Sequence, residues 1–208
     1  KLDRQFMKAI DLFSDWALKD RDLGLEKNHM PAVESMLSLF IDKQSKKFSF
    51  IDVGCGNGYV VREVSKHPLC HKSIGVDGSI EMIKKAKLID PDGEYICSDI
   101  SSWYPSEKVN ILQSMEVMYY LENPKDTLIN FKQNYLKKNG MMIMGIDFYF
   151  ENSQCHSWPK DLNVPMKLFS INEWKEILID SGFSNIKFYQ KHAKENFPGT
   201  LILSAINF

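Results

Sequence analysis

Cysteine is scarce in this sequence, and its four cysteines form no CxxC pair. The scattered positions of Cys55, Cys70, Cys97 and Cys155 indicate neither a disulfide framework nor a zinc knuckle. No cluster of cysteine, histidine and carboxylate residues shows the spacing of metal ligands. We therefore expect reduced thiols and no bound metal.

An excess of charge of either sign is also missing, because 26 Lys and Arg residues stand against 27 Asp and Glu residues. The net charge of −1 lacks the basic footprint that binding to phosphate backbones requires, so we expect no nucleic-acid partner. No apolar run is long enough to span a bilayer, and KLDRQFMKAI lacks the basic-then-apolar order of a signal peptide. We predict a cytoplasmic protein without membrane contacts, either a monomer or a homodimer.

The length of 208 residues suits one well-packed domain with appendages rather than two independent cores. Apolar residues at helical spacing predict an amphipathic helix over about residues 4–19. Residues 20–30 are interpreted as a loop, and Pro31 suits the first turn of a second helix. We expect these helices, within residues 1–47, to form an N-terminal helical lid.

From Phe48 onward, short apolar runs alternate with amphipathic segments, and this pattern predicts a core over residues 48–208. Alternating strands and helices favour parallel pairing with right-handed crossovers. The predicted fold is α/β: a doubly wound, Rossmann-like sheet of seven strands with helices on both faces. The last two strands, joined by a short loop, should pair antiparallel.

Three further features concern the second half of the core. Gly140 is predicted to stop a helix, and residues 148–169 form an aromatic-rich insertion on the substrate side. A capping box of Ser170 and Glu173 should open a helix that runs through Leu178 and ends at Gly182.

The motif Asp52-Val53-Gly54-Cys55-Gly56-Asn57-Gly58 follows the first predicted strand and opens a helix. Glycines at alternating positions let backbone amides approach a ligand closely. Asp77 ends the next strand, near the interval at which a carboxylate accepts ribose hydroxyls. Both features fit a nicotinamide-binding domain as well as a methyltransferase.

The spacing of the glycines separates these two classes. A dinucleotide fingerprint needs a small third residue in G-x-G-x-x-G, and Tyr59 occupies that position here. The sequence instead resembles the class I S-adenosylmethionine-dependent methyltransferases. The resemblance runs through FIDVGCGNGYV, IGVDGSIEMIKKAK, CSDISSW, NILQSMEVMYYLENP and LKKNGMMIMG.

This resemblance implies S-adenosylmethionine as cofactor and assigns residues to its methionine part. Gly54, Cys55 and Gly56 would offer main-chain contacts. Asp52 would brace the loop and receive the ammonium group, directly or through water. The carbonyl of Ser114 would also meet that group.

The resemblance also assigns residues to the adenosine part of the cofactor. Asp77 would hold the ribose hydroxyls, and Gly78 and Met82 would line the adenine slot. Asp99 would accept a hydrogen bond from the exocyclic amine of adenine, and the backbone amide of Ile100 would reach the adenine ring.

The acceptor side carries less information. The stretch SMEVMYYLENP resembles ubiquinone-biosynthesis O-methyltransferases, but Tyr119-Tyr120 replaces their Glu-His pair, so neither their catalytic roles nor their phenol substrates transfer. Our catalytic candidates are Glu116, Tyr119 and His29, although Glu116 is also compatible with a local cap. Arg21 is a candidate for binding the cofactor carboxylate.

We therefore expect in-line methyl transfer to oxygen or nitrogen of a small-molecule acceptor. Two alternatives stay open: a methyltransferase acting on protein or RNA, disfavoured by the neutral charge, and a nicotinamide-dependent oxidoreductase, disfavoured by the glycine spacing.

Overall fold

A seven-stranded sheet organises the molecule, whose structure is a computed structural model that describes residues 6–208. The strand order is β3-β2-β1-β4-β5-β7-β6. The five strands from β3 to β5 are parallel, and β7 pairs antiparallel with both β5 and β6, as predicted. The strands are β1 (Phe48–Val53), β2 (Cys70–Asp77), β3 (Glu94–Cys97), β4 (Val109–Met115), β5 (Leu136–Ile146), β6 (Ser184–Lys191) and β7 (Thr200–Asn207).

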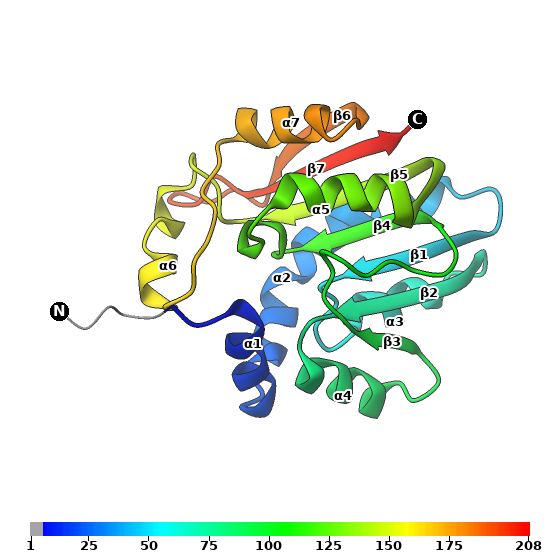
Figure 1. Ribbon diagram of the computed structural model, residues 1–208, viewed down its shortest axis with the longest axis horizontal. Coiled ribbons are helices and arrows are strands. Elements are labelled where there is room, and N and C mark those ends of the chain that lie inside the picture. The colour runs from blue at the N-terminus through cyan, green and yellow to red at the C-terminus, as the bar shows by residue number, and fades with distance from the viewer. Residues whose placement is uncertain (1–5) are drawn as a thin grey trace.

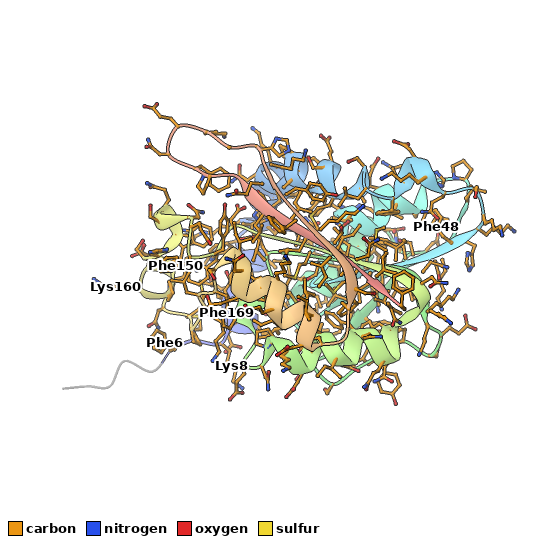
Figure 2. The ribbon with its side chains drawn as sticks, turned by 90° about the horizontal axis from the view of Figure 1, so that it is seen from above. Phe6, Lys8, Phe48, Phe150, Lys160 and Phe169 are labelled. Carbon is orange, nitrogen blue, oxygen red and sulfur yellow. The ribbon has the colours of Figure 1, made fainter. Side chains whose placement is uncertain are left out.

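Helices cover both faces of this sheet, which confirms the doubly wound α/β fold (Figures 1 and 2). The α-helices are α1 (Ala9–Leu18), α2 (Asp22–Leu37), α3 (Tyr59–Ser65), α4 (Ile80–Ile89), α5 (Pro124–Asn130), α6 (Trp158–Asp161) and α7 (Ile171–Asp180). Short 3₁₀ turns are η1 (Ile41–Lys43), η2 (Met118–Tyr120) and η4 (Ser153–Cys155), and η3 (Phe131–Tyr135) is a π-helical turn. Within residues 6–208, no helix has the length and apolar character needed to cross a membrane.

The hydrophobic core has two main layers because successive side chains of a strand point to opposite faces. Ile51 packs in the layer that contains Leu128 of α5 and Trp174 of α7. Its neighbour Phe50 packs in the layer under α2 and α3, which contains Val60. Because the strands from β3 to β5 run parallel, their carboxyl ends lie at one edge of the sheet, where ligands bind in open α/β folds.

The N-terminal helices differ from the prediction at one important place. Residues 20–30 were predicted to form a loop, but α2 begins at Asp22 and carries Pro31 in its interior. The prediction was wrong because tertiary packing outweighs the cost of a proline in the helix: the second half of α2 is buried in the sheet core through Val33 and Met36. α1 begins at Ala9, and the part of its prediction on residues 4 and 5 lies outside the described residues.

The prediction that Gly140 stops a helix was also wrong. The helix ends in the π-helical turn at Tyr135, and Gly140 lies within β5, where a Cβ atom would stand only 2.8 Å from the carbonyl oxygen of Lys137. Glycine is therefore needed for close backbone approach beside the irregular pairing of β4 and β5. The capping box of Ser170 and Glu173 is present.

Candidate active site

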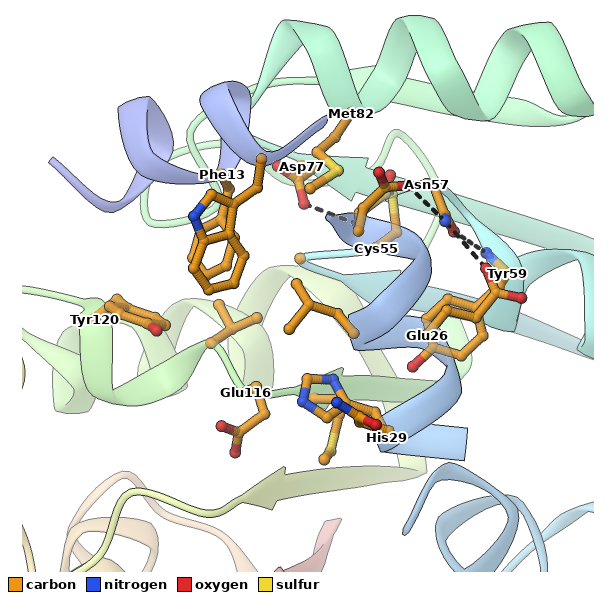
Figure 3. A pocket seen from close by; sticks show the side chains of 18 of the residues that line it. Phe13, Glu26, His29, Cys55, Asn57, Tyr59, Asp77, Met82, Glu116 and Tyr120 are labelled. Carbon is orange, nitrogen blue, oxygen red and sulfur yellow. Dashed lines mark hydrogen bonds between the residues drawn. The ribbon is translucent and has the colours of Figure 1, made fainter. Parts of the chain in front are cut away.

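A cavity of about 490 Å³ lies at the carboxyl ends of the parallel strands, under α1 and the first half of α2. This volume falls in the range of small-molecule sites. Asp77 and Met82 lie at one end of the cavity, and Glu116 and His29 lie at the other (Figure 3). The structure brings nine predicted site residues together in its wall: His29, Asp52, Gly54, Cys55, Gly56, Asp77, Met82, Glu116 and Tyr119.

Gly78 and Asp99, both assigned to adenine by resemblance, do not lie in this wall. Gly78 is covered by α1, and a Cβ atom there would come within 2.7 Å of Ile10. Asp99 is exposed, and its carboxylate accepts a hydrogen bond from the backbone amide of Ser101 at 2.9 Å. Their predicted contacts with the adenine therefore stay predictions.

Three other predicted residues also lie outside the cavity wall. Ile100 is part of the hydrophobic core, and Ser114 is buried in β4. Arg21 is exposed just before α2. Their assigned contacts likewise stay predictions.

The loop after β1 is shaped for a ligand by its glycines. Gly54 and Gly56 have φ angles of +77° and +53°, a left-handed region that other residues rarely adopt. A Cβ atom at Gly56 would meet only the sulfur of Met82, at 3.9 Å, so this side of the loop is open. The backbone can therefore lie directly against a bound molecule.

Asp77 connects the end of β2 to this loop. Its carboxylate accepts a hydrogen bond from the backbone amide of Gly56 at 2.9 Å (Figure 3). It accepts a second one from the backbone amide of Ser79 at 2.8 Å. Burial nevertheless raises the pKa of Asp77, and burial together with the charge of Asp77 raises the pKa of Asp52 to about 8. The buried carboxylate of Asp52 and the half-buried one of Asp77, which raises the pKa of its neighbour, favour a ligand that brings hydroxyl or ammonium donors.

The N-terminal helices are fixed over the loop by a polar network. Asp22 of α2 is buried and pairs with Lys85 of α4 at 2.6 Å. The side-chain amide of Asn57 donates to Asp22 at 3.0 Å and to Glu26 at 3.1 Å. A buried charge needs such partners, so the network determines where α2 lies over the cavity.

Glu116 anchors the opposite end of the cavity. It follows β4 with a φ angle of +57°, unusual for a residue other than glycine. Its carboxylate accepts hydrogen bonds from the Tyr119 hydroxyl at 2.6 Å and from the backbone amide of Asp147. Burial, and then the charge of Asp147, raises the pKa of Glu116. The carboxylate thus lines the cavity while also holding the local backbone.

His29 projects from α2 into the same end of the cavity (Figure 3). Burial lowers the pKa of its imidazole to about 4. The ring is therefore neutral near pH 7 and can accept or donate one hydrogen bond without carrying charge.

Sequence reasoning missed several residues of the wall, among them Glu26, Asn57, Tyr59 and Asp147. Asp147 directly follows β5, so the rule that ligands bind at the carboxyl ends of strands could have found it. Glu26 lay in a segment predicted to be a loop, which concealed its position on a helix.

A family model described as a methyltransferase domain matches residues 6–187. The chain belongs to this family. It is a class I S-adenosylmethionine-dependent methyltransferase, and S-adenosylmethionine is its cofactor. The methyltransferase fold explains the strand order, the antiparallel β7 and the position of the cavity.

Curated relatives share modest identity with this methyltransferase. A malonyl-[acyl-carrier protein] O-methyltransferase from Halalkalibacterium halodurans is 25% identical over 172 residues, which cover 75% of this chain and 63% of the relative. A trans-aconitate 2-methyltransferase from Azoarcus sp. is 27% identical over 94 residues, covering 45% of this chain and 37% of the relative. The methyltransferase thus spans less than two thirds of the length of these relatives.

Solved structures share its fold at lower identity. One is a complex between the Haloferax volcanii Trm112 methyltransferase activator and a methyltransferase, with a TM-score of 0.80, 22% identity, and coverage of 94% of this chain and 97% of that one. Another is the N-methyltransferase NodS of Bradyrhizobium japonicum in complex with S-adenosyl-L-homocysteine, with a TM-score of 0.65, 16% identity, and coverage of 85% of both chains.

Proposed function

We propose that this methyltransferase transfers the methyl group to a small-molecule acceptor bound at the Glu116 end of the cavity. The observation that carries the proposal is the position of α1 and α2, which cover the cavity and are tied to it through the buried Asp22. A cavity of about 490 Å³ that must also hold the cofactor leaves room for a small acceptor. A protein or RNA substrate would have to bring its nucleophile past these helices.

We infer that the residues at the Asp77 end hold the cofactor. Asp77 accepts the ribose hydroxyls, Met82 lines the adenine, and the backbone around Gly56 contacts the methionine part. Asp52 receives the ammonium group. The buried carboxylates and the open side of Gly56 fit these groups. When bound, the cofactor supplies an activated methyl group on a sulfonium.

The protein's own contribution at the acceptor end is positioning. Holding two reactants in line supplies about 7–11 kcal/mol towards the barrier. Glu116, Tyr119 and His29 lie where they can orient the acceptor and take a proton from it. Such a base contributes about 10²–10⁴-fold where the acceptor must lose a proton.

The first test addresses the cofactor. S-Adenosylhomocysteine should raise the melting temperature of the protein, since a ligand at 100 times its dissociation constant adds about 2.7 kcal/mol of stability. NAD should leave the melting temperature unchanged. A shift with NAD and none with S-adenosylhomocysteine would contradict the cofactor assignment.

The second test addresses the acceptor. The protein is incubated with methyl-labelled cofactor and a cell extract that is then separated into small molecules, protein and RNA. Label in the small-molecule fraction supports the proposal. Label in protein or RNA would overturn the small-molecule acceptor.

A further inference from the structure

Acidic side chains dominate the wall of the cavity, and no described basic one offsets them. The carboxylates that line it are Asp22, Glu26, Asp52, Asp77, Glu116, Asp147 and Asp161. Among the described residues of the wall there is no lysine or arginine, and His29 is neutral near pH 7. Lys85 and Asn57 satisfy Asp22 from the loop side, and Asp52 and Asp77 lie at the end assigned to the cofactor. At the opposite end, neither Glu116 nor Asp147 forms an ion pair with a described residue.

Glu116 and Asp147 form a pair at that end. The backbone amide of Asp147 donates to the Glu116 carboxylate, which brings the two residues into contact. One oxygen of Asp147, Oδ1, is buried without a hydrogen-bond partner among the described residues. Burial raises the pKa of both carboxyl groups, and the charge of Asp147 contributes to the shift at Glu116. A side-chain hydrogen bond with Thr200 acts against the rise at Asp147, so only one of its two oxygens lacks a partner. An unpaired buried acceptor and a like-charged neighbour are both stabilised when a cationic donor binds between them.

Aromatic rings also line the cavity, and those of Tyr119 and Tyr120 lie beside Glu116. The rings of Tyr119 and Tyr120 are 4.4 Å apart, and Phe13 of α1 stands 5.4 Å from Tyr120 in an edge-on contact. Trp16 and Trp158 also line the cavity. Faces of aromatic rings attract cations, and attraction is strongest where water is excluded.

We infer that the acceptor is an amine that binds as a cation and is methylated on nitrogen. The inference rests on the proposed small-molecule function and narrows it to one class of acceptor. An anionic acceptor, such as a carboxylate, would meet charges of its own sign at Glu116 and Asp147. A neutral alcohol would leave the pair without a counter-charge.

The reaction balances with groups already in place. The bound ammonium gives one proton to the carboxylate of Glu116 or Asp147, which frees the lone pair on nitrogen. That lone pair forms the new C–N bond as the C–S bond of the donor breaks, and the electron pair of the broken bond stays on sulfur. The products are a methylated ammonium ion, a thioether and one proton, which passes from the carboxylate to water. The raised pKa of both carboxyl groups suits them to hold that proton.

The first experiment measures cofactor affinity of the variant Glu116→Gln by calorimetry. Because S-adenosylhomocysteine lacks the sulfonium charge, comparing it with S-adenosylmethionine shows whether Glu116 serves the cofactor. If Glu116 serves the acceptor, both affinities stay within about twofold of the parent. A loss of about tenfold or more for either ligand would place the carboxylate at the sulfonium or ammonium of the cofactor and overturn the inference.

The second experiment identifies the charge of the product. A polar-metabolite extract is methylated with labelled cofactor, and the labelled product is passed over a cation exchanger at pH 7. Retention on the exchanger supports an amine acceptor, and passage in the neutral or anionic fraction overturns it. Absence of label from every small-molecule fraction would instead contradict the proposed function itself.

Variants complete this test. Glu116→Gln and Asp147→Asn should each raise the KM for the retained acceptor by about tenfold or more, because each removes one charge from the pair. Glu122→Gln makes the same chemical change at an exposed residue close by in the chain and should behave as the parent. Unchanged KM in both test variants would also overturn the inference.

Discussion

Asp52 shows how a binding residue can lower the stability of the empty protein. Burial and the neighbouring Asp77 raise the pKa of its carboxyl group from 3.8 to about 8. The folded state therefore keeps a proton that the unfolded state releases, and the contribution of Asp52 to stability falls as the pH rises from about 4 to 8. A cationic ligand group would reverse this loss.

We predict that Asp52→Asn removes this pH dependence. The melting temperature of the ligand-free variant should exceed that of the parent by an amount that grows between about pH 5 and pH 8, while its affinity for S-adenosylhomocysteine falls. Thermal melts over this pH range and calorimetry measure the two effects. A difference in melting temperature between variant and parent that is the same at every pH would show that Asp52 does not titrate as described.

Asp77 should contribute directly to cofactor affinity. Each hydrogen bond to a charged group is worth about 1.5–3 kcal/mol, so Asp77→Ala should weaken S-adenosylhomocysteine binding by about tenfold or more. Asp92→Ala, at an exposed turn, provides the matched control. Equal affinities for both variants by calorimetry would place the ribose elsewhere.

Individual positions differ in how well sequence predicts them. Asp77 could be predicted because its interval from the glycine loop reflects a fixed strand-helix-strand geometry. Asp147 has no such interval from a sequence motif, and its place at the end of β5 follows only from the topology of the sheet. The pairing of Glu116 with Asp147 depends on strand register, which a linear pattern does not contain.

At the scale of elements, a helix is predicted well when the interactions that stabilise it join residues close together in the sequence. α7 was predicted from its capping box, whose bonds join residues three positions apart. α2 was predicted only in part because Gly24, Asn28 and Pro31 weaken its local helical signal. Contacts of α2 with distant segments, such as the ion pair of Asp22 with Lys85, stabilise the helix where its local helical propensity is weak.

The ion pair between α2 and α4 gives a prediction at this scale. Lys85→Gln leaves the buried Asp22 without its cation, so α2 should dock less firmly and the affinity for S-adenosylhomocysteine should fall by about tenfold. Protease cleavage near residues 19–22 should become faster in the ligand-free protein.

The control for this prediction lies next to it on the same helix. Lys84 pairs with Glu81 on the exposed side of α4, and exposed pairs contribute little, so Lys84→Gln should resemble the parent. Equal affinity and equal cleavage in the two lysine variants would show that α2 docks without the Lys85 ion pair.

At the scale of the whole molecule, we predict turnover without a metal ion. Within residues 6–208, no group of three or more His, Cys, Asp or Glu residues could hold one. Treatment with a chelator should leave the rate of methyl transfer unchanged. A rate that is lost with the chelator and restored by magnesium or zinc would reveal a metal requirement.

The attachment of the covering helices to the sheet has a kinetic consequence. Only residues 38–47 separate the end of α2 from β1, so the helices and the glycine loop belong to one short stretch of chain. The second half of α2 and Phe40 are themselves buried in the core, so the covering helices stay attached to the sheet at any dilution of the protein. We therefore expect movements of their first turns over a bound molecule to be first-order events, with a rate that stays the same when the enzyme is scarce.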